Sequence, residues 1–502
     1  MGNLSAMHAP LSTHPPGPER HLGGLALTLV LALVPACADD GQESRDDAAE
    51  APSLRARIVW NADVPKTGRS SPRLTDLTGD GIPDVVIGGG QERTEGSISV
   101  LNGADGQLVW RRLYYDEVYA TALLMDVNAD DVPDVIIGRR KLAGDLDCLD
   151  GRNGEELWTL SGTNPDEHIP KTHFNSCIPA PDLDGDGLPD LIGLQSGGRD
   201  RPDKPEKAKR LPARVWVLSS ATGELLHKYL TVDRLESYSV PALQQLPDGS
   251  HQLFLGTGGE TLPGHVLCLD FPSFEERWRF ASDTKGFVAG LLLHDFEGSG
   301  RNDVIATAFD GVLSRLHGET GEELWRMERP GFEVYSTPGL GRFDDSDDVL
   351  DLVLTLTEGT WPDYSSRAII VWVDGATGEV LEERDYGVMA SSSPAILDLD
   401  GDGLDEVVHA TNLGFSPYPS KVQSVLSIFD GGPGKRELLR REFNGWTAVS
   451  PWIGDLDGNR RLDIVHAPFG STMRLELKEP TRHRIFWNGY RGESLDGIVP
   501  RR

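Results

Sequence analysis

Short apolar runs recur along the chain, and each one follows an acidic segment that contains small or turn-forming residues. The runs are only a few residues long, as in 85–87, 135–137 and 191–194. Runs of this length that are bounded by aspartate, glycine and proline predict β-strands, because a helix needs a longer periodic stretch. The runs recur at intervals of roughly 50 residues, which indicates a repeated structural unit.

A second pattern alternates with the first and consists of two short strands around a glycine-containing turn. It occupies residues 101–110, 149–158, 218–226, 316–325 and 373–381. Two apolar stretches joined by such a turn predict a β-hairpin. One repeat therefore contains a strand, an acidic loop, a second strand, a variable connection and a hairpin.

Four antiparallel strands in serial repeats predict an all-β fold, a single β-propeller with four-stranded blades. Counting from Asp76 gives eight units, with seven blades as the alternative. Two units lack a good acidic loop: 245–255 has a Pro-Asp-Gly turn instead, and 342–354 carries an extra residue. Both 57–60 and 484–487 are candidates for the outermost strand that closes the ring, and the sequence does not decide between them.

The acidic loop from Asp182 to Asp190 has the composition of a cation site. Asp182, Asp184, Asp186 and Asp190 stand at positions 1, 3, 5 and 9 of a nine-residue segment. This spacing allows a tight loop to turn several oxygens toward one hard cation, and calcium is the natural candidate. An EF-hand would also need a preceding helix and a glutamate at position 12, which are absent. Asp-Gly turns held by their own hydrogen bonds, without metal, are the alternative.

Composition and charge support this picture and exclude one class of partner. The 502 residues include 57 Gly and 33 Pro, which suits a turn-rich β protein. The net charge is −31. Such a chain has little with which to neutralise phosphates, so we expect no nucleic-acid partner. The charge favours cations and partners that are basic or uncharged.

The N-terminal residues predict export and a lipid anchor. An apolar run from Leu22 to Ala36 is too short to span a bilayer comfortably, and small residues lead into Cys37. We expect a signal peptide over 1–36, lipidation of Cys37, a flexible acidic tether over 37–54 and the propeller over 55–502. The protein would then lie outside the cytoplasm, anchored to the outer membrane; secretion with an incidental cysteine is the alternative. Outside the cytoplasm a disulfide is plausible, with Cys148–Cys177 as the preferred pair because the two are near in sequence; three buried unpaired thiols are an equal alternative.

The nine-residue segment occurs six times, and these units resemble the FG-GAP or VCBS repeats of integrin α-chain propellers and of bacterial surface proteins. The resemblance covers roughly residues 71–490. It implies several structural calcium ions. The ligands that it implies, loop by loop, are Asp76, Asp80 and Asp84; Asp126, Asn128, Asp130 and Asp134; Asp182, Asp184, Asp186 and Asp190; Asp295, Glu297 and Asp303; Asp398, Asp400, Asp402 and Glu406; and Asp455, Asp457, Asn459 and Asp463.

The hairpins that end in tryptophan also resemble quinoprotein blades. That resemblance implies that Trp110, Trp158, Trp278 and Trp325 pack between blades. The adjacent cysteine pair of quinoprotein dehydrogenases is missing, so we expect no bound pyrroloquinoline quinone.

Strand alternation places the acidic loops and the hairpin turns on one face of the disc, here called the loop face. The opposite face, here called the link face, collects the second-to-third-strand connections and the links between blades. These segments are longer and more variable, and long loops on a rigid scaffold commonly carry binding sites. Their aromatic and histidine residues are Tyr114, Tyr115, Tyr119, His168, His173, Phe174, Tyr335, Trp361, Tyr364, Phe415, Tyr418 and Trp446.

The predicted function is non-catalytic binding of a protein or glycan on the link face. His409 and His466 occupy equivalent positions in neighbouring blades, and hydrogen-bonded packing is expected there rather than metal or acid–base chemistry. None of the common hydrolase, metalloprotease or phosphate-binding motifs occurs. The alternatives are an enzyme of the polysaccharide-lyase kind, which some calcium-containing propellers resemble, and a scaffold for outer-membrane assembly.

Overall fold

The structure is a computed structural model, and it describes residues 53–91, 94–140, 145–161, 173–199, 210–360, 363–414, 416, 418–492 and 495–500. The predicted signal peptide, the lipidation site Cys37 and nearly all of the tether lie outside the described residues. In the part that is described, no helix has the length and apolar character needed to cross a membrane.

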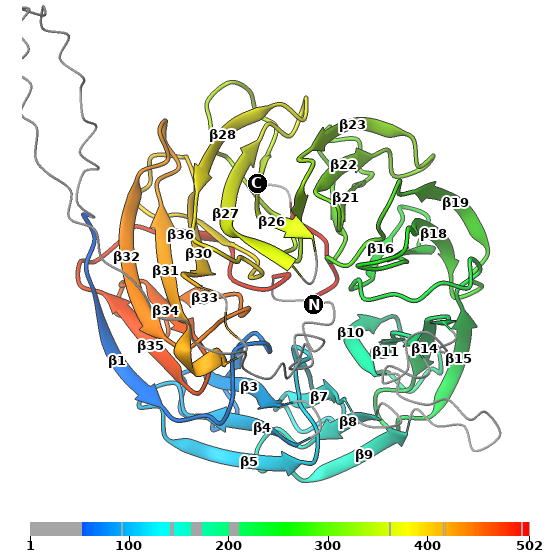
Figure 1. The fold of residues 1–502 in the computed structure, drawn as a ribbon. Helices are drawn as coiled ribbons and strands as arrows, with labels where there is room; N and C mark the ends of the chain where they lie inside the picture. Colours follow the sequence, from blue (N-terminus) through cyan, green and yellow to red (C-terminus); the bar gives the residue numbers. More distant parts are fainter. Residues whose placement is uncertain are drawn as a thin grey trace, which may run out of the picture.

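Eight antiparallel sheets stand side by side in a closed ring (Figure 1), so the prediction of an eight-bladed β-propeller is confirmed. The strands of blades 1 to 4, from the centre outward, are β2 (Arg73–Thr75), β3 (Asp84–Gln91), β4 (Glu95–Leu101) and β5 (Leu108–Tyr114); β6 (Leu123–Met125), β7 (Asp134–Gly138), β8 (Asp145–Leu149) and β9 (Glu156–Ser161); β10 (Phe174–Ala180), β11 (Asp190–Gln195), β14 (Arg214–Leu218) and β15 (Leu225–Leu230); and β16 (Ala242–Gln245), β17 (His251–Gly256), β18 (His265–Phe271) and β19 (Glu276–Ala281).

Blades 5 to 8 follow the same plan with small additions. Their strands are β20 (Leu292–His294), β21 (Asp303–Ala308), β22 (Val312–Leu316) and β23 (Glu323–Glu328); β24 (Phe332–Glu333) and β25 (Gly339–Gly341), both paired with β26 (Asp351–Thr360), then β27 (Asp363–Val373) and β28 (Val380–Asp385); β29 (Ala395–Asp398), β30 (Glu406–Asn412), β31 (Gln423–Phe429) and β32 (Glu437–Asn444); and β33 (Trp452–Gly454), β34 (Asp463–His466), β35 (Thr472–Leu477) and β1 (Ala56–Ala62). The link face also carries the small pair β12 (Gly198–Arg199) and β13 (Arg210–Leu211) and a 3₁₀ helix, η3 (Pro419–Lys421).

Burial follows from this layered arrangement. The second strands β3, β7, β11 and β21 are almost entirely buried, because neighbouring blades cover both of their faces. The outermost strand β15 alternates between exposed and half-buried residues instead. The apolar runs that mark the repeats in the sequence are therefore the second strands of the blades.

The two irregular units are blades, as predicted. In blade 4 a tight turn between Leu246 and Ser250 replaces the acidic loop. In blade 6 the backbone N–H of Phe343 donates to Asp351 eight residues later. The corresponding distance along the chain is seven residues in blade 1, between Leu77 and Asp84. The extra residue read from the sequence is thus present in the blade 6 loop.

The ring is closed by β1, which the sequence placed as one of two candidates. It pairs with β35 from Ala56 to Ala62 and completes blade 8 (Figure 1). The other candidate, β36 (Arg484–Trp487), pairs with β29 on the inner edge of blade 7. Blade 7 therefore has five strands, and the fifth lies toward the centre of the ring.

The described part of the C-terminal segment after β36 crosses the middle of the ring (Figure 1). Innermost strands hold it: Leu243 N donates to Asp496 O at 3.3 Å, and Leu293 N donates to Gly497 O at 2.8 Å. The buried guanidinium of Arg491 donates to the carbonyls of Val240 and Pro241, both at 2.9 Å. The chain thus occupies its own axis, which the sequence did not reveal.

Tryptophans join each of five blades to the next, which confirms the packing role expected for Trp110, Trp158, Trp278 and Trp325. Each indole N–H donates to a hairpin carbonyl of the following blade, as Trp110 does to Gly151 at 2.8 Å. Trp60 of β1 makes the same contact with Gly103 across the closing seam. The glycine of each of these hairpin turns packs against the tryptophan indole: at Gly154, with φ of 74°, an added Cβ would stand 2.6 Å from Trp110.

The three cysteines of the described chain are buried free thiols, so the expected Cys148–Cys177 disulfide is wrong. Cys148 belongs to the third strand of blade 2 and Cys177 to the innermost strand of blade 3. Burial raises the pKa of Cys177 to about 12. Each thiol therefore behaves as a small apolar core residue.

Candidate functional site: acidic loops and the link face

The last acidic residue of each acidic loop, here called the closing carboxylate, is buried, and in several blades it ties its loop to the hairpin of the same blade. In blade 1, Asp84 accepts hydrogen bonds from Leu77 N and Thr78 N, both at 2.9 Å, and from Gly103 N at 3.3 Å. The same double contact, to a loop N–H and a hairpin glycine N–H, recurs at Asp134, Asp351 and Glu406. The closing carboxylate is therefore a structural joint as well as a candidate metal ligand.

The first aspartate of each acidic loop accepts hydrogen bonds from backbone N–H groups later in the same loop. Asp182 accepts from Gly185 N at 2.6 Å and from Gly187 N at 3.0 Å, and both glycines have a positive φ, of 81° and 91°. Asp76 and Asp398 make comparable contacts in their loops. These contacts hold the turn in place before any cation is considered.

Three of the six predicted loops bring three carboxylates together. In each, one ligand atom from each residue lies within 4.8 Å of the others, and the groups are Asp182, Asp184 and Asp190; Asp398, Asp400 and Glu406; and Asp455, Asp457 and Asp463. Oxygen-only groups of this kind suit calcium. Asp186 and Asp402 stand outside these groups, and Asn459 turns its amide toward Glu476 at 2.7 Å.

The other three predicted loops form no such group among the described residues. In blade 1, the side chain of Asn102 donates to Asp80 at 2.7 Å. In blade 2, Arg152 forms an ion pair with Asp130, while Asn128 faces Asp134. Protein donors thus occupy oxygens that the repeat pattern assigns to calcium. Asp126, Asp295 and Glu297 likewise belong to no three-carboxylate group.

Burial raises the pKa of several closing carboxylates. The pKa rises to about 8 at Glu406 and to about 6 at Asp134, mainly because burial disfavours the charged form. Neighbouring carboxylates raise the pKa of Asp190 further, after burial. A cation among these groups would reverse this tendency, since it stabilises the ionised form.

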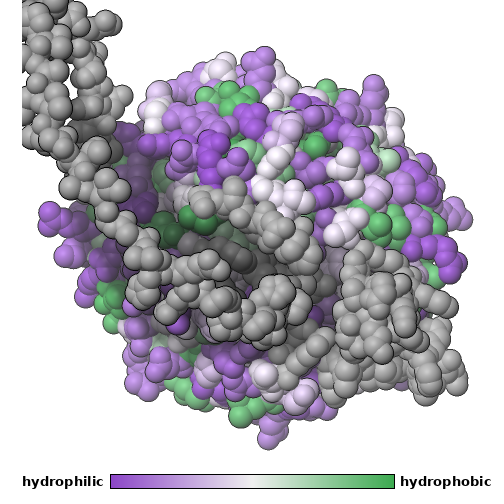
Figure 2. Space-filling view, viewed as in Figure 1, coloured by the Kyte–Doolittle hydropathy of each residue, from purple (hydrophilic) through white to green (hydrophobic). Residues whose placement is uncertain are grey.

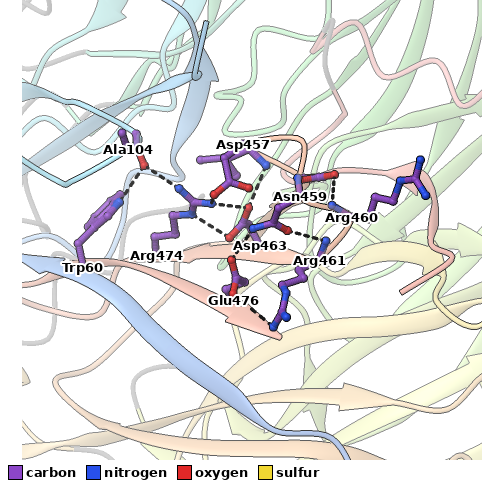
Figure 3. A network of polar contacts seen from close by, with 12 residues as sticks. Trp60, Ala104, Asp457, Asn459, Arg460, Arg461, Asp463, Arg474 and Glu476 are labelled. Atoms are coloured by element: carbon purple, nitrogen blue, oxygen red, sulfur yellow. Dashed lines mark hydrogen bonds and ion pairs between the residues drawn. The ribbon is translucent and has the colours of Figure 1, made fainter. Parts of the chain in front are cut away.

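A buried arginine of the third strand supplies a positive charge in two of the loops, and the sequence reasoning missed both residues. Arg474 of β35 reaches Asp457 and Asp463 in blade 8 (Figure 3), and Arg315 of β22 reaches Asp303 in blade 5. Both stand on the third strand, one residue before a buried leucine. The equivalent residues of the other blades are uncharged: Val100, Cys148, Val217, Cys268, Trp372 and Ile428. Comparison of the repeats at this position could have found them.

The link face divides the aromatic residues predicted there into exposed and buried groups. Tyr115 is 69% exposed and Tyr418 is 62% exposed, with Lys421 Nζ 4.9 Å from the Tyr418 ring centroid. Tyr119, His173, Phe174, Tyr335 and Trp446 are buried. His168, Trp361, Phe415 and the side chain of Tyr364 lie outside the described residues. The described candidates for direct contact are thus Tyr115 and Tyr418.

Buried polar contacts support the link face from beneath. Arg69 donates to Glu117 at 2.9 Å, and its guanidinium carbon lies 5.7 Å from the Trp446 ring centroid. Tyr335 donates to Glu260 at 3.4 Å. Burial raises the pKa of that carboxyl to about 8. This face combines acids and aromatics, and the segment Glu-Val-Tyr recurs in it at 117–119 and 333–335.

Both paired histidines are core residues, but the expected hydrogen-bonded packing is found only at His409, since neither ring nitrogen of His466 has a hydrogen-bond partner among the described residues. His409 contacts the Ser392 carbonyl at 2.8 Å, and burial lowers its pKa to about 4. His466 is also buried, packs 5.4 Å from Phe443 between ring centroids, and has its pKa lowered to about 3. Both are therefore neutral at ordinary pH.

A small cavity lies where the C-terminal segment meets blades 2 and 3. Its lining includes Tyr119, Asn175, Cys177, Tyr490 and Leu495. The titratable groups among its described lining residues are the phenols of Tyr119 and Tyr490 and the thiol of Cys177. Burial raises the pKa of all three.

No model of a protein family matches the chain. Human protein FAM234B is 30% identical over 142 residues, which make up 26% of this chain and 22% of FAM234B. The chain thus matches only about a fifth of that protein.

Solved structures match over most of the chain at low identity. Quinohemoprotein alcohol dehydrogenase ADHIIG from Pseudomonas putida HK5 has a TM-score of 0.55 at 9% identity, covering 86% of this chain and 77% of that chain. The quinohemoprotein alcohol dehydrogenase from Comamonas testosteroni has a TM-score of 0.54 at 10% identity, covering 86% and 78%. BamB from Moraxella catarrhalis has a TM-score of 0.48 at 14% identity, covering 84% and 100%. The dehydrogenase matches establish a shared propeller fold.

Proposed function

We propose that this protein is a non-catalytic, calcium-stabilised β-propeller that binds a protein or glycan through its link face. In the same proposal it acts outside the cytoplasm, with a lipid on Cys37 holding it to the outer membrane. The repeat pattern, its resemblance to FG-GAP or VCBS units and the lipobox-like N-terminus support these assignments. A bound calcium ion would supply positive charge to a loop such as that of Asp182, Asp184 and Asp190.

The observation that carries the binding role is the filling of the propeller axis by the chain itself. Trp487, Tyr490, Arg491 and Leu495 are buried along this path. A ligand is consequently expected on the outer surfaces rather than in a central pocket. Of these surfaces, the link face offers variable loops with exposed tyrosines, while the loop face repeats the same contacts in blade after blade.

The surface seen in Figure 2 is mostly hydrophilic over the described residues, with scattered apolar side chains. Such a surface suits a polar ligand. Aromatic rings beside acids, as on the link face, can stack on sugar rings or receive basic peptide side chains.

A glycan array and a panel of purified extracellular proteins, each probed with the full chain in calcium and in EDTA, test this proposal. We expect a ligand that is lost in Tyr115→Ala and Tyr418→Ala and kept in Leu225→Ala. Leu225 is 47% exposed on the outermost strand β15, so it controls for loss of an exposed apolar side chain. Release of unsaturated sugar products from a bound polysaccharide would overturn the non-catalytic assignment. Binding that survives both tyrosine changes would remove the ligand from this part of the link face.

A further inference from the structure

The acidic loop of blade 8 surrounds a guanidinium group. Arg474 donates from Nε to Asp463 Oδ1 at 2.8 Å and from Nη2 to Asp463 Oδ2 at 2.9 Å (Figure 3). The same Nη2 donates to Asp457 Oδ2 at 2.7 Å. Arg474 is only 1% exposed. Two carboxylates of the predicted calcium set therefore share a cation that belongs to the protein.

The remaining amino group of Arg474 reaches across the closing seam. Its Nη1 donates to the Gly103 carbonyl of blade 1 at 3.3 Å. Trp60 donates to the same carbonyl at 2.8 Å. The planar guanidinium has donors on several sides, so one side chain can satisfy both the loop and the next blade. A metal ion bound in the loop would donate no hydrogen bond to the Gly103 carbonyl.

Blade 5 repeats the arrangement. Arg315 donates from Nε to Asp303 at 2.7 Å, and its Nη2 lies 3.4 Å from Glu297. Its Nη1 donates to the Gly375 carbonyl of blade 6 at 3.3 Å, and Trp325 donates to that carbonyl too. Two blades that are not neighbours thus use the same residue, strand position and inter-blade acceptor.

Blade 3 provides the contrast. Its equivalent residue is Val217, so the loop receives no positive charge from that strand. Asp190 is fully buried and belongs to the group with Asp182 and Asp184. Its Oδ1 has no hydrogen-bond partner in the described structure. A buried carboxylate oxygen left without a donor is costly, and a bound cation would satisfy it.

We propose that the guanidinium groups of Arg315 and Arg474 replace calcium in blades 5 and 8, whereas the blade 3 loop binds a calcium ion. The repeat pattern assigns calcium to all three loops, and the side chains of two of them do not fit that assignment. A guanidinium already bonded to the carboxylates both repels a divalent cation and occupies the oxygens that the ion needs. The closing seam between blades 8 and 1 is accordingly independent of calcium.

Counting bound calcium by equilibrium dialysis of the full chain at millimolar calcium tests the proposal. We expect Asp457→Asn to leave the number of bound ions unchanged, because Arg474 holds that site. We expect Asp184→Asn, the matched change in blade 3, to remove one ion. Both variants keep Arg474, so neither leaves Asp463 without its guanidinium partner.

Arg474→Leu supplies the converse measurement, since it recreates the apolar residue of the other blades. We expect this variant to gain one bound ion, and we expect Arg474→Leu with Asp457→Asn to lose it again. If Arg474→Leu does not fold, Asp457→Asn alone decides the matter. Loss of an ion in Asp457→Asn would overturn the arginine assignment, and an unchanged count in Asp184→Asn would overturn the blade 3 assignment. These counts are independent of any link-face ligand, so the binding proposal stands or falls separately.

Discussion

The loop face and the link face of the propeller are built from the same strands but use them differently. On the loop face, closing carboxylates and tryptophan contacts recur from blade to blade, as at Asp84, Asp351, Trp110 and Trp325. On the link face, ion pairs such as Arg69 with Glu117 and Lys285 with Glu333 differ in their residues from blade to blade. Repetition assigns the loop face to holding the ring together and leaves the link face free to specialise.

The largest effect expected from this comparison comes from removing an inter-blade tryptophan. Trp110→Ala deletes a buried indole and its 2.8 Å bond to Gly151, and it should lower the free energy of unfolding by about 3–5 kcal/mol. Trp110→Phe keeps much of the volume and should cost less. Urea unfolding monitored by circular dichroism measures both. Equal losses in the two variants would mean that packing of the ring contributes little to the seam.

Calcium removal should have the next largest effect, again on the loop face. An ion that binds only the folded state adds about 3 kcal/mol at a hundredfold excess over its Kd. EDTA should therefore lower Tm by several degrees, and added calcium should restore it. The Asp184→Asn variant should show a smaller shift. An unchanged melt in EDTA would contradict calcium stabilisation.

The pH dependence of stability should distinguish the structural role of a closing carboxylate, which joins its loop to the hairpin, from a role as a metal ligand. Blade 6 has no complete acidic loop, and burial raises the pKa of Asp351 there from 3.8 to about 7. Asp351 thus binds its proton more tightly in the folded chain than in the unfolded chain. The contribution of this protonation to the free energy of unfolding is fully present below about pH 4 and is lost as the pH rises toward 7. The difference should be on the order of 1–3 kcal/mol.

Asp351→Asn cannot ionise and provides the comparison. The free energy of unfolding of the unmodified protein should fall between pH 4.5 and 7.5 relative to this variant, in urea titrations with EDTA present. Parallel pH curves for the two proteins would show that Asp351 does not titrate in this range.

The smallest effects on stability should come from the link face. Tyr115→Ala and Tyr418→Ala remove exposed rings, so each should change the free energy of unfolding by less than about 0.5 kcal/mol. Each should nevertheless weaken ligand binding by roughly tenfold or more if it contacts the ligand. Isothermal calorimetry with the ligand found on the arrays measures this. A ligand-binding loss in Trp110→Ala without unfolding would break the separation of the two faces.

Repetition made the architecture predictable from the sequence. The second strands, the hairpins, the extra residue before Asp351 and the tryptophan contacts all follow from patterns that recur. The acidic loops were only partly predictable, because a loop's partners include a third strand whose residues lie 11 to 18 positions further along the chain. Arg315 and Arg474 enter from that strand.

Features that occur once were the least predictable. Whether β1 or β36 completes blade 8 depends on pairing between the ends of the chain. The path of 488–492 and 495–500 along the axis depends on space that only the assembled ring defines. Comparison of the links could have separated buried Tyr119 and Tyr335, which share a Glu-Val-Tyr motif, from exposed Tyr115 and Tyr418, which stand outside it.

The pairing of β1 with β35 also orders events during synthesis. The first strand of the ring leaves the ribosome hundreds of residues before its partner; Asn61 and Ser471, whose side chains meet at the seam, are 410 positions apart. During that interval the unpaired edge needs to be kept from other strands. The ring closes only after β35 has been made, so a chain that is terminated before β35 is left with an open edge on β1.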